Sequence, residues 1–363
     1  MNIEWSEKNK EMQALLAKET TYRDGIQKLL ELRTDLFQQV TYLMNLPKEA
    51  FSKMPFAGSK GYHSKTIAYS IWHVFRIEDI VVHELIAGDT QVLFRDGHEE
   101  AIHPSLITTG NELEGEAIVE FSRGLDVNAL FSYAKAVKES TDEVLGNLSY
   151  ADLKRKFSEE DKEKLAETGC VSRDENAFWL IDYWCGKDVR GLLKMPLSRH
   201  WMMHIEAAQR IKNKLCKLAR KGVDPIACCG FSCNHCFLGQ WCGSCRTEYN
   251  TCSFATCFPD RKCPNVSCCR EKGLDGCYEC EELETCEKGF YIPGNDGAQA
   301  AKAQAMFLRN HSKKEFLRLH DRLHEQNDFA KTQELLGQDR LQGLQLLEEQ
   351  YEKLCSDEKK GKK

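Results

Sequence analysis

The sequence predicts a mainly α-helical protein: a helical bundle, then a small cysteine-rich metal-binding module, then further helices. Three observations predict this class. Apolar residues recur at helical spacing through the first 220 residues, and no strand alternation is long enough for a sheet. Of the 18 cysteines, 14 lie between Cys228 and Cys286, and helical sequence resumes after about residue 297. A chain of 363 residues also exceeds what one compact core usually holds, so several domains are expected.

Three helices are predicted before residue 150. The first covers residues 1–46, where apolar positions follow the helical period, and it ends before Pro47. The second runs from about Ser64 to Ala87 and stops at a glycine. The third covers residues 127–146. The intervening segment 88–125 is punctuated by Gly and Pro, and we expect a long crossover loop there.

The rest of the bundle is predicted from its start and stop signals. A polar surface helix is expected over residues 150–167. Ser172 and Glu175 have the S-x-x-E spacing of a capping box, which should open a helix to about Leu193. Pro196 then falls in the first turn of the next helix, which ends at a Lys-Gly-Val-Asp-Pro linker, residues 221–225.

These signals divide the chain into four parts. Residues 1–220 form the helical bundle, and residues 226–291 form the cysteine-rich module. A second linker at 291–297 leads to a helical segment, 297–355, which should pack on the module. Residues 356–363 are a charged tail.

Composition limits the compartment and the partners. The amino terminus is polar and no run of about 18 apolar residues occurs, so a soluble, cytoplasmic protein with no membrane partner is expected. In a reducing compartment, dense cysteines are more often metal-bound than disulfide-bonded. The net charge is −6, and residues 228–291 hold six Lys/Arg against nine Asp/Glu, which argues against nucleic-acid binding.

Two histidines lie four residues apart in LSRHWMMHIEAAQRIKNKL, residues 197–215. On a helix, His200 and His204 share one face with a row of apolar residues, so both should point into the bundle. That apolar row is Ala207, Ile211, Leu215 and Leu218. A pair of hydrogen-bonded core histidines is one interpretation. The other is a shared metal ion, because two buried imidazoles bring four ring nitrogens that need partners.

His73 is the predicted third ligand. In SKTIAYSIWHVFRIEDIVVHEL it shares the apolar face of its helix with Tyr69, Ile77 and Ile80. His83 falls about 80° from that face by helical geometry and is expected at the surface. The remaining histidines of this half, His63, His98 and His103, lie in or beside loops and are set aside. With an ordinary pKa of ~6.5, protons should compete with an ion at such a site just below neutrality.

A histidine after Trp in IWHVFRIED, followed by YWCGKDVRGLLKMPLSRH and SRHWMMH, resembles the DinB/YfiT-like superfamily of metal-binding four-helix bundles over about residues 20–220. The resemblance implies an up-down-down-up bundle in which His73, His200 and His204 hold a divalent metal such as zinc or nickel. The family includes thiol-dependent transferases and isomerases, and a hydrolase. The helix at 173–193 and the crossover at 88–125 are where this chain departs from the pattern, and they would shape a substrate pocket.

The cysteine module contains three CxxC pairs, beginning at Cys233, Cys242 and Cys277. This spacing lets two thiolates reach one tetrahedral ion from a single turn, which favours zinc. An iron–sulfur cluster is the alternative. The expected ligands are Cys229, Cys233, Cys236, Cys242, Cys245, Cys252, Cys263, Cys268, Cys269, Cys277, Cys280 and Cys286. A module this small, with few large apolar residues, should need metal to fold.

From CCGFSCNHC through CYEC to AQAAKAQAMFLRNHSKKEFLRLH, about residues 226–325, the chain resembles a family of small cysteine-rich bacterial and archaeal domains of unknown function. This resemblance implies no activity.

Two functions remain open at this point. One is a divalent-metal-dependent transferase or hydrolase acting on a small molecule such as a low-molecular-weight thiol. The other is a non-catalytic metal- or thiol-sensing protein, or an iron–sulfur protein. The sequence identifies no general base, since Glu78 and Glu206 lie off the face that carries the histidines. A homodimer is one possible assembly.

Overall fold

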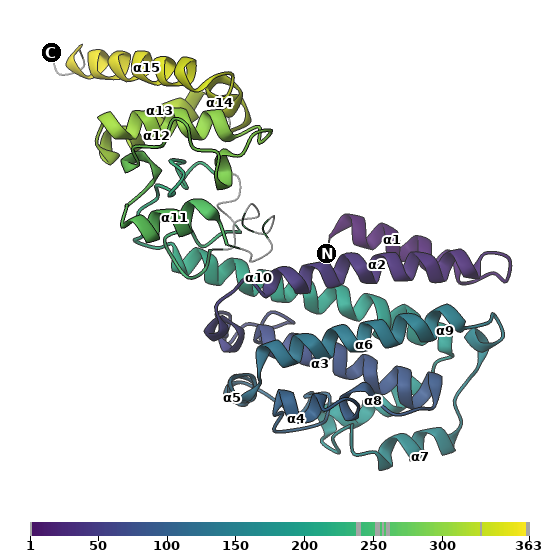
Figure 1. The fold of residues 1–363 in the computed structure, drawn as a ribbon. Helices are drawn as coiled ribbons and strands as arrows, with labels where there is room; N and C mark the ends of the chain where they lie inside the picture. The colour runs from purple at the N-terminus through teal and green to yellow at the C-terminus, as the bar shows by residue number, and fades with distance from the viewer. Residues whose placement is uncertain are drawn as a thin grey trace. The chain divides into compact units, whose positions relative to one another are not determined.

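The computed structural model describes residues 2–236, 241–250, 255, 258, 262–326 and 329–360. Within these residues the chain is mainly helical, as predicted, and contains no β-strand beyond two isolated bridges. The chain forms two compact units, Met1–Lys212 and Asn213–Lys363. Each is described by itself below (Figure 1).

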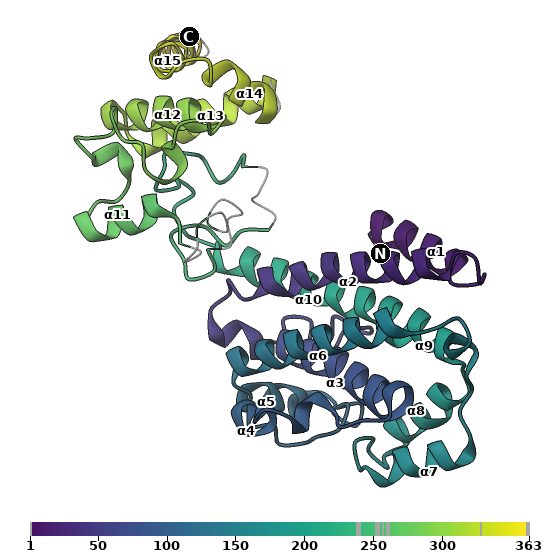
Figure 2. The same ribbon diagram turned by 45° about the vertical axis from the view of Figure 1, so that its right-hand side comes forward.

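The first unit is built on four long helices. In both views α2 lies beside α10 and α3 lies beside α6 (Figures 1 and 2). Shorter helices cover the ends and one side of this group. The long helices are α2 (Tyr22–Leu43), α3 (Ile67–Ile80), α6 (Val127–Asn147) and α10 (His200–Ala219), the last of which belongs to this unit up to Lys212. The apolar residues at helical spacing are therefore the core of this unit.

The N-terminal residues form two helices where one was predicted. Helix α1 (Ile3–Leu15) ends in a turn and α2 runs back along it (Figure 1). The Thr21 hydroxyl donates a hydrogen bond to the Leu15 carbonyl across this turn. Gly25 permits the close return, because a Cβ there would lie 2.8 Å from the backbone nitrogen of Leu16. The turn interrupts the apolar spacing, since residues 18–25 read Lys-Glu-Thr-Thr-Tyr-Arg-Asp-Gly, and the single-helix prediction overlooked this break.

Helix α3 is the central element, because all 14 of its residues are buried. It continues without a break into a π-helical segment, η2 (Val81–Ala87), and ends at Gly88 in the left-handed conformation, φ 71°. Such complete burial requires its polar side chains to be paired. Arg33 of α2 makes a bidentate ion pair with Glu78, and Arg76 pairs with Asp79.

The segment 88–125 is more ordered than the loop that was predicted. It contains η3 (Val92–Phe94), α4 (His98–Ile102) and α5 (Glu116–Gly124). Its backbone is hydrogen-bonded to α3 side chains: the Asp79 carboxylate accepts from two of its amides, and Trp72 donates to the Thr108 carbonyl. These contacts between distant parts of the sequence have no local sequence signal.

The helices that lead into α10 are shorter than predicted: the helix expected over residues 150–167 is the short η4 (Asp152–Lys154) and a helix that begins at Glu159, and the helix expected to run to about Leu193 is divided in two. Helix α7 (Glu159–Glu167) opens with a capping box between Ser158 and Asp161. The box predicted from Ser172 to Glu175 is wrong: α8 (Glu175–Cys185) is capped by Asp174, whose carboxylate accepts from the amide of residue 176. After α9 (Val189–Lys194), the proline of the next turn lies in a π-helical segment, η5 (Met195–Arg199), which runs into α10.

The second unit combines cysteine-rich turns with helices. Its elements are α11 (Pro264–Lys272), η8 (Cys277–Glu279), η9 (Gly289–Tyr291), α12 (Ala298–Asn310), α13 (Lys313–Gln326), α14 (Phe329–Leu336) and α15 (Arg340–Lys360). One apolar cluster joins residues before α12, such as Ile226 and Tyr278, to Phe307 and Leu347 of the later helices. Helix α15 continues through most of the predicted tail. In the described residues, no helix has the length and apolar character needed to cross a bilayer.

Candidate metal centre

The structure brings the three predicted histidines together. His73 projects from the middle of α3, and His200 and His204 from the first two turns of α10. One donor nitrogen from each ring lies within 4.8 Å of the other two. Across the described parts of the chain, no other set of three or more His, Cys, Asp or Glu side chains meets this criterion.

Hydrogen bonds orient the ring of His73. Its Nδ1 lies 2.8 Å from the Thr109 carbonyl oxygen, which can only accept, so Nδ1 carries the proton and Nε2 has the free lone pair. That Nε2 lies 3.2 Å from Nε2 of His200. The carbonyl belongs to the segment 88–125, so this segment sets the tautomer of a predicted ligand.

The other two rings are not satisfied by the protein. The Nδ1 atoms of His200 and His204 are buried and have no hydrogen-bond partner among the described residues. Buried polar atoms without partners are costly and uncommon in native structures. A hydrogen-bonded core pair, the first interpretation of these histidines, satisfies the rings only in part: His200 and His73 can share one hydrogen bond between their Nε2 atoms, and the two Nδ1 atoms are left without a partner.

Burial keeps all three imidazoles neutral at physiological pH. Burial lowers the pKa of His73 to about 4, and the hydrogen bond to Thr109 opposes this shift only in part. Burial also holds the pKa values of His200 and His204 well below the ordinary value, and the neighbouring histidines lower them further. Neutral imidazole is the form that binds metal, so no proton has to leave before an ion enters.

A buried polar network links α3 to α10 beside the histidines. The Glu78 carboxylate accepts two hydrogen bonds from Arg33 and one, at 2.7 Å, from Nε1 of Trp201. Arg33 also pairs with Asp142 of α6, at 2.8 Å. Trp201 directly follows a predicted ligand, so the network fixes the positions of α3 and α10 relative to each other near the site.

Side chains of the loop before α3 lie beside the rings. Tyr62, 49% exposed, stands edge-on to His204 with ring centroids 4.9 Å apart. Lys65 is half-buried, and its Nζ lies 5.1 Å from the ring centroid of Tyr69, which stacks on His73 at 5.5 Å. The positive charge of Lys65 contributes to the lowered pKa of His73 and of His204.

Two sequence-based placements are wrong. His83 is fully buried rather than at the surface, and its Nδ1 lies 2.5 Å from the Asp89 carboxylate. Helix α3 is buried on every side and most of η2 is buried as well, so a position that lies off the face of His73 is still inside the unit. Leu218 is 49% exposed, while the other three apolar residues predicted on its face are buried.

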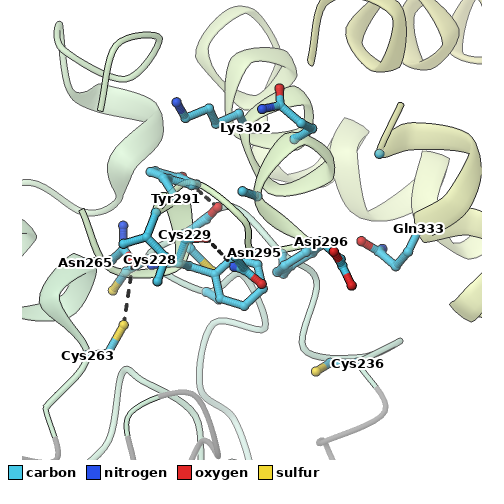
Figure 3. A pocket seen from close by; sticks show the side chains of 18 of the residues that line it. Cys228, Cys229, Cys236, Cys263, Asn265, Tyr291, Asn295, Asp296, Lys302 and Gln333 are labelled. Carbon is cyan, nitrogen blue, oxygen red and sulfur yellow. Dashed lines mark hydrogen bonds between the residues drawn. The ribbon is translucent and has the colours of Figure 1, made fainter. Parts of the chain in front are cut away.

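The cysteines of the second unit divide between two cavities. A cavity of about 1470 Å³ is lined by Cys228, Cys229, Cys233, Cys236, Cys242, Cys245 and Cys263. Figure 3 shows it: Cys228, Cys229 and Cys263 lie near Asn265 and Tyr291, and Cys236 lies apart from them. A cavity of about 20 Å³ is lined by Cys268, Cys269, Cys277, Cys280 and Cys286. Cys252 lies outside the described residues.

Contacts between thiols connect the two groups. Cys228 was not among the predicted ligands, yet its Sγ lies 3.7 Å from that of Cys245, and its side chain also hydrogen-bonds that of Cys269. Cys269 in turn lies 3.7 Å from Cys277, Sγ to Sγ. The doublets Cys228-Cys229 and Cys268-Cys269 give no sequence signal for which member faces the other thiols.

Hydrogen bonds between neighbouring thiols lower the pKa of one partner and raise that of the other. They lower the pKa of Cys228 to about 3, with Cys245 as the largest cause, and that of Cys277 to about 7, with Cys269 as the largest cause. The same contacts raise the pKa values of Cys245 and Cys269, and burial raises the pKa of Cys233 to about 11. In this row Cys228 and Cys277 are therefore the two thiols that favour the thiolate form that a soft metal ion binds.

Comparison of the chain with protein-family models, curated proteins and solved structures finds no match.

Proposed function

We propose that the first unit is a DinB-like four-helix bundle and a divalent-metal-dependent enzyme. The observation that supports the proposal best is the convergence of three buried, neutral imidazoles, His73, His200 and His204, from two helices. Three protein ligands and a fourth, open position are typical of catalytic rather than structural zinc sites.

The donor set fits such an ion. Two nitrogens bound to one tetrahedral zinc at 2.0–2.1 Å are about 3.3 to 3.4 Å apart. The Nε2 atoms of His73 and His200 are 3.2 Å apart. The ring of His73 has the tautomer that presents Nε2, and its Nδ1 proton is held by a backbone carbonyl, an arrangement common for histidine ligands.

A bound divalent ion with an open position lowers the pKa of a coordinated water or thiol and so supplies a nucleophile. The chain's own residues would orient and bind the reactants. Thr109 keeps the proton at Nδ1 of His73, and Lys65 places a cationic side chain near the rings, which suits an anionic substrate. We therefore propose a transferase using a low-molecular-weight thiol, or a hydrolase, acting on a small molecule.

The acidic residues near the ligands have other roles. Glu78 is fully buried and accepts hydrogen bonds from Arg33 and Trp201. Glu206 lies 3.5 Å from the guanidinium of Arg210. Neither is assigned as general base, so a coordinated thiol, which needs only to lose a proton to bulk water, is the reactant that this site suits best.

Non-catalytic metal sensing is the second candidate. The exposed fractions of His73, His200 and His204 are 5%, 8% and 4%. Such burial favours retention of an ion over access for a substrate. Turnover of thiol substrates by the metal-loaded protein separates the two candidates.

For the second unit we propose structural zinc bound by the cysteines, with an iron–sulfur cluster as the alternative. Thiolates are soft donors, and a closed four-thiolate shell holds zinc inertly. The three-histidine site should exchange its ion more readily and accept nickel, cobalt or iron. We further propose a cytoplasmic protein, in which thiols stay reduced, with no nucleic-acid or membrane partner and with a homodimer as a possible assembly.

Metal analysis of three variants tests the histidine centre. The protein is purified anaerobically and its metal content is measured by mass spectrometry for wild type, His200→Ala and His63→Ala. We expect His200→Ala to lose one ion per chain. His63, a half-buried histidine outside the group, is the matched control and should keep the full count. An unchanged count in His200→Ala would contradict the proposal.

A further inference from the structure

We propose that the small cavity between α11, η8 and the segment before η9 is a metal site, with Cys269, Cys277, Cys280 and Cys286 as its four ligands. This assignment rests on the proposal that the cysteine module binds metal, and it specifies which cysteines act together. We expect the bound ion to be a divalent metal that prefers sulfur ligands, with zinc as the leading candidate.

The size of the cavity fits a single ion. Its volume is about 20 Å³, and about 10 to 15 Å³ is enough for one water molecule. A small organic ligand needs a far larger space. The occupant must therefore be a single atom or a water, and the chemistry of the walls decides between them.

The walls present sulfur. Five of the twelve residues that line the cavity are cysteines, two are leucines, and the other five carry polar groups: Asn265, Lys272, Glu282, Lys288 and Tyr291. A water molecule would bond to these polar groups and make little use of the five thiols, which are weak hydrogen-bond partners. Thiolates are strong ligands of zinc, so the walls favour an ion over water.

Spacing supports the same conclusion. Sulfurs bound to one tetrahedral zinc at ~2.3 Å are about 3.8 Å apart. The Sγ atoms of Cys269 and Cys277 are 3.7 Å apart, and both residues are buried. Cys277 and Cys280 form a CxxC pair on the short turn η8, which suits two ligands of one ion. Of the two neighbours on α11, Cys269 is buried and contacts Cys277, so we assign it rather than Cys268 as the ligand. Cys280 is included as the CxxC partner of Cys277, and Cys286 as the remaining cysteine of the cavity wall.

Neighbouring groups complement a negatively charged thiolate shell. The amide Nδ2 of Asn265 lies 3.5 Å from Sγ of Cys277, and Nζ of Lys272 lies 3.6 Å from Sγ of Cys280. Lys288 also lines the cavity. Donors and cations around ligand atoms orient them and offset their charge. A bound ion would join α11, η8 and the chain beyond it, three segments that are otherwise short.

Zinc counting on the full-length chain tests the ligand set. A His200→Ala background removes the proposed histidine-bound ion, so the remaining zinc reports on cysteines. In that background we expect Cys280→Ser and Cys269→Ser each to lose one ion, while Cys268→Ser, a neighbour on the same helix, and Cys355→Ser, on α15, keep the full count. If Cys280→Ser keeps its zinc, or if Cys268→Ser loses an ion and Cys269→Ser does not, the assignment is overturned.

Thiol alkylation provides a test that does not depend on folding of the variants. Wild-type protein is treated with iodoacetamide before and after chelation of its zinc, and each cysteine is followed by peptide mass spectrometry. Cys277, Cys280 and Cys286 should be protected before chelation and become at least tenfold more reactive after it. Equal reactivity in both states overturns the site. A failure here leaves the result for His200→Ala unaffected, so the two proposals are judged separately.

Discussion

The histidine group and the cysteine module achieve ligand placement in opposite ways. The three histidines lie on long helices whose own packing and buried ion pairs bring the nitrogens together. Most of the cysteines lie on short turns, and in the described residues no three sulfurs fall within 4.8 Å of one another. A site that the fold has already assembled can lose its ion and keep its shape. A site placed by turns depends on its ion for that shape.

Removal of all metal should produce the largest difference in stability between the two units. A structural zinc contributes about 10 to 16 kcal/mol of apparent binding free energy in small cysteine modules. We expect a strong chelator to expose residues 226–291 to limited proteolysis, while circular dichroism retains most of the helical signal of the first unit. Unchanged protection of residues 226–291 after complete metal removal would show that the module, like the bundle, is assembled by packing alone.

Breaking the buried ion pair should damage the histidine region without touching a ligand. Arg33→Ala leaves Glu78 charged and unpaired in the core, so the unfolding free energy of the first unit should fall by about 3 to 5 kcal/mol. Urea denaturation measures this loss. The double variant Arg33→Met/Glu78→Gln keeps an acceptor for Trp201 and should lose less. A decrease in unfolding free energy of less than about 1 kcal/mol for Arg33→Ala would mean that this ion pair contributes little to the assembly of the site.

Acid should lower the stability of the metal-free first unit through His73. His73 is neutral in the folded protein down to about pH 4, whereas in the unfolded chain it takes up a proton near pH 6.5. The unfolded state therefore gains protons first, and the metal-free first unit should lose stability as the pH falls from about 6.5 to 4, by up to about 3 kcal/mol from His73. Urea denaturation at several pH values tests this, and a His73→Gln variant should show a shallower slope.

The same shift corrects the expected competition between protons and metal. Ordinary imidazoles would release an ion just below neutrality, but these rings resist protonation because they are buried. We expect the ion to be retained below pH ~6.5, the pKa of an ordinary imidazole. Metal loss measured by dialysis between pH 7 and pH 4 checks this.

Replacement of a helix cap should have the smallest effect. Asp174 caps α8 and Ser172 does not, so Asp174→Ala should cost about 1 kcal/mol of stability and Ser172→Ala clearly less. Thermal unfolding of both variants measures the difference. The reverse order would favour the capping box predicted from sequence over the observed cap.

The features that sequence could predict are those with local periodicity. The helical class, the core-facing side of α10 and the pairing of His73 with His200 and His204 all follow from apolar spacing. The turn between α1 and α2 has a local signal that the single-helix prediction overlooked, because Lys-Glu-Thr-Thr and Arg-Asp-Gly interrupt the apolar spacing within residues 18–25. The position of His83 is not predicted because α3 and most of η2 are buried on every side, so the angle from His73 does not decide exposure.

The contacts of the site that arise between distant segments could not be predicted. Nothing near Thr109 indicates that its carbonyl meets His73, and nothing near Arg33 indicates that its partner is Glu78. Among the cysteines, spacing singles out the CxxC pairs, whereas the structure has thiol contacts of Cys228 with Cys245 and Cys269, and of Cys269 with Cys277. Which thiols face each other depends on how α11 packs against the turns, a tertiary property.

The acceptor that fixes His73 belongs to a peptide bond, and this has a consequence for mutational robustness. No replacement of the Thr109 side chain removes its carbonyl, so an alanine scan would pass over a group that sets the tautomer of a ligand. A mutation can disturb the hydrogen bond to His73 only by changing the path of the loop that carries this carbonyl. Gly110 has φ 76°, and a Cβ there would lie 3.1 Å from the ring of Tyr69, which stacks on His73. Over evolutionary time Gly110 and the length of the loop should be constrained by the Thr109 carbonyl, and position 109 separately by its own side chain, which is fully buried and donates a hydrogen bond to Asn111.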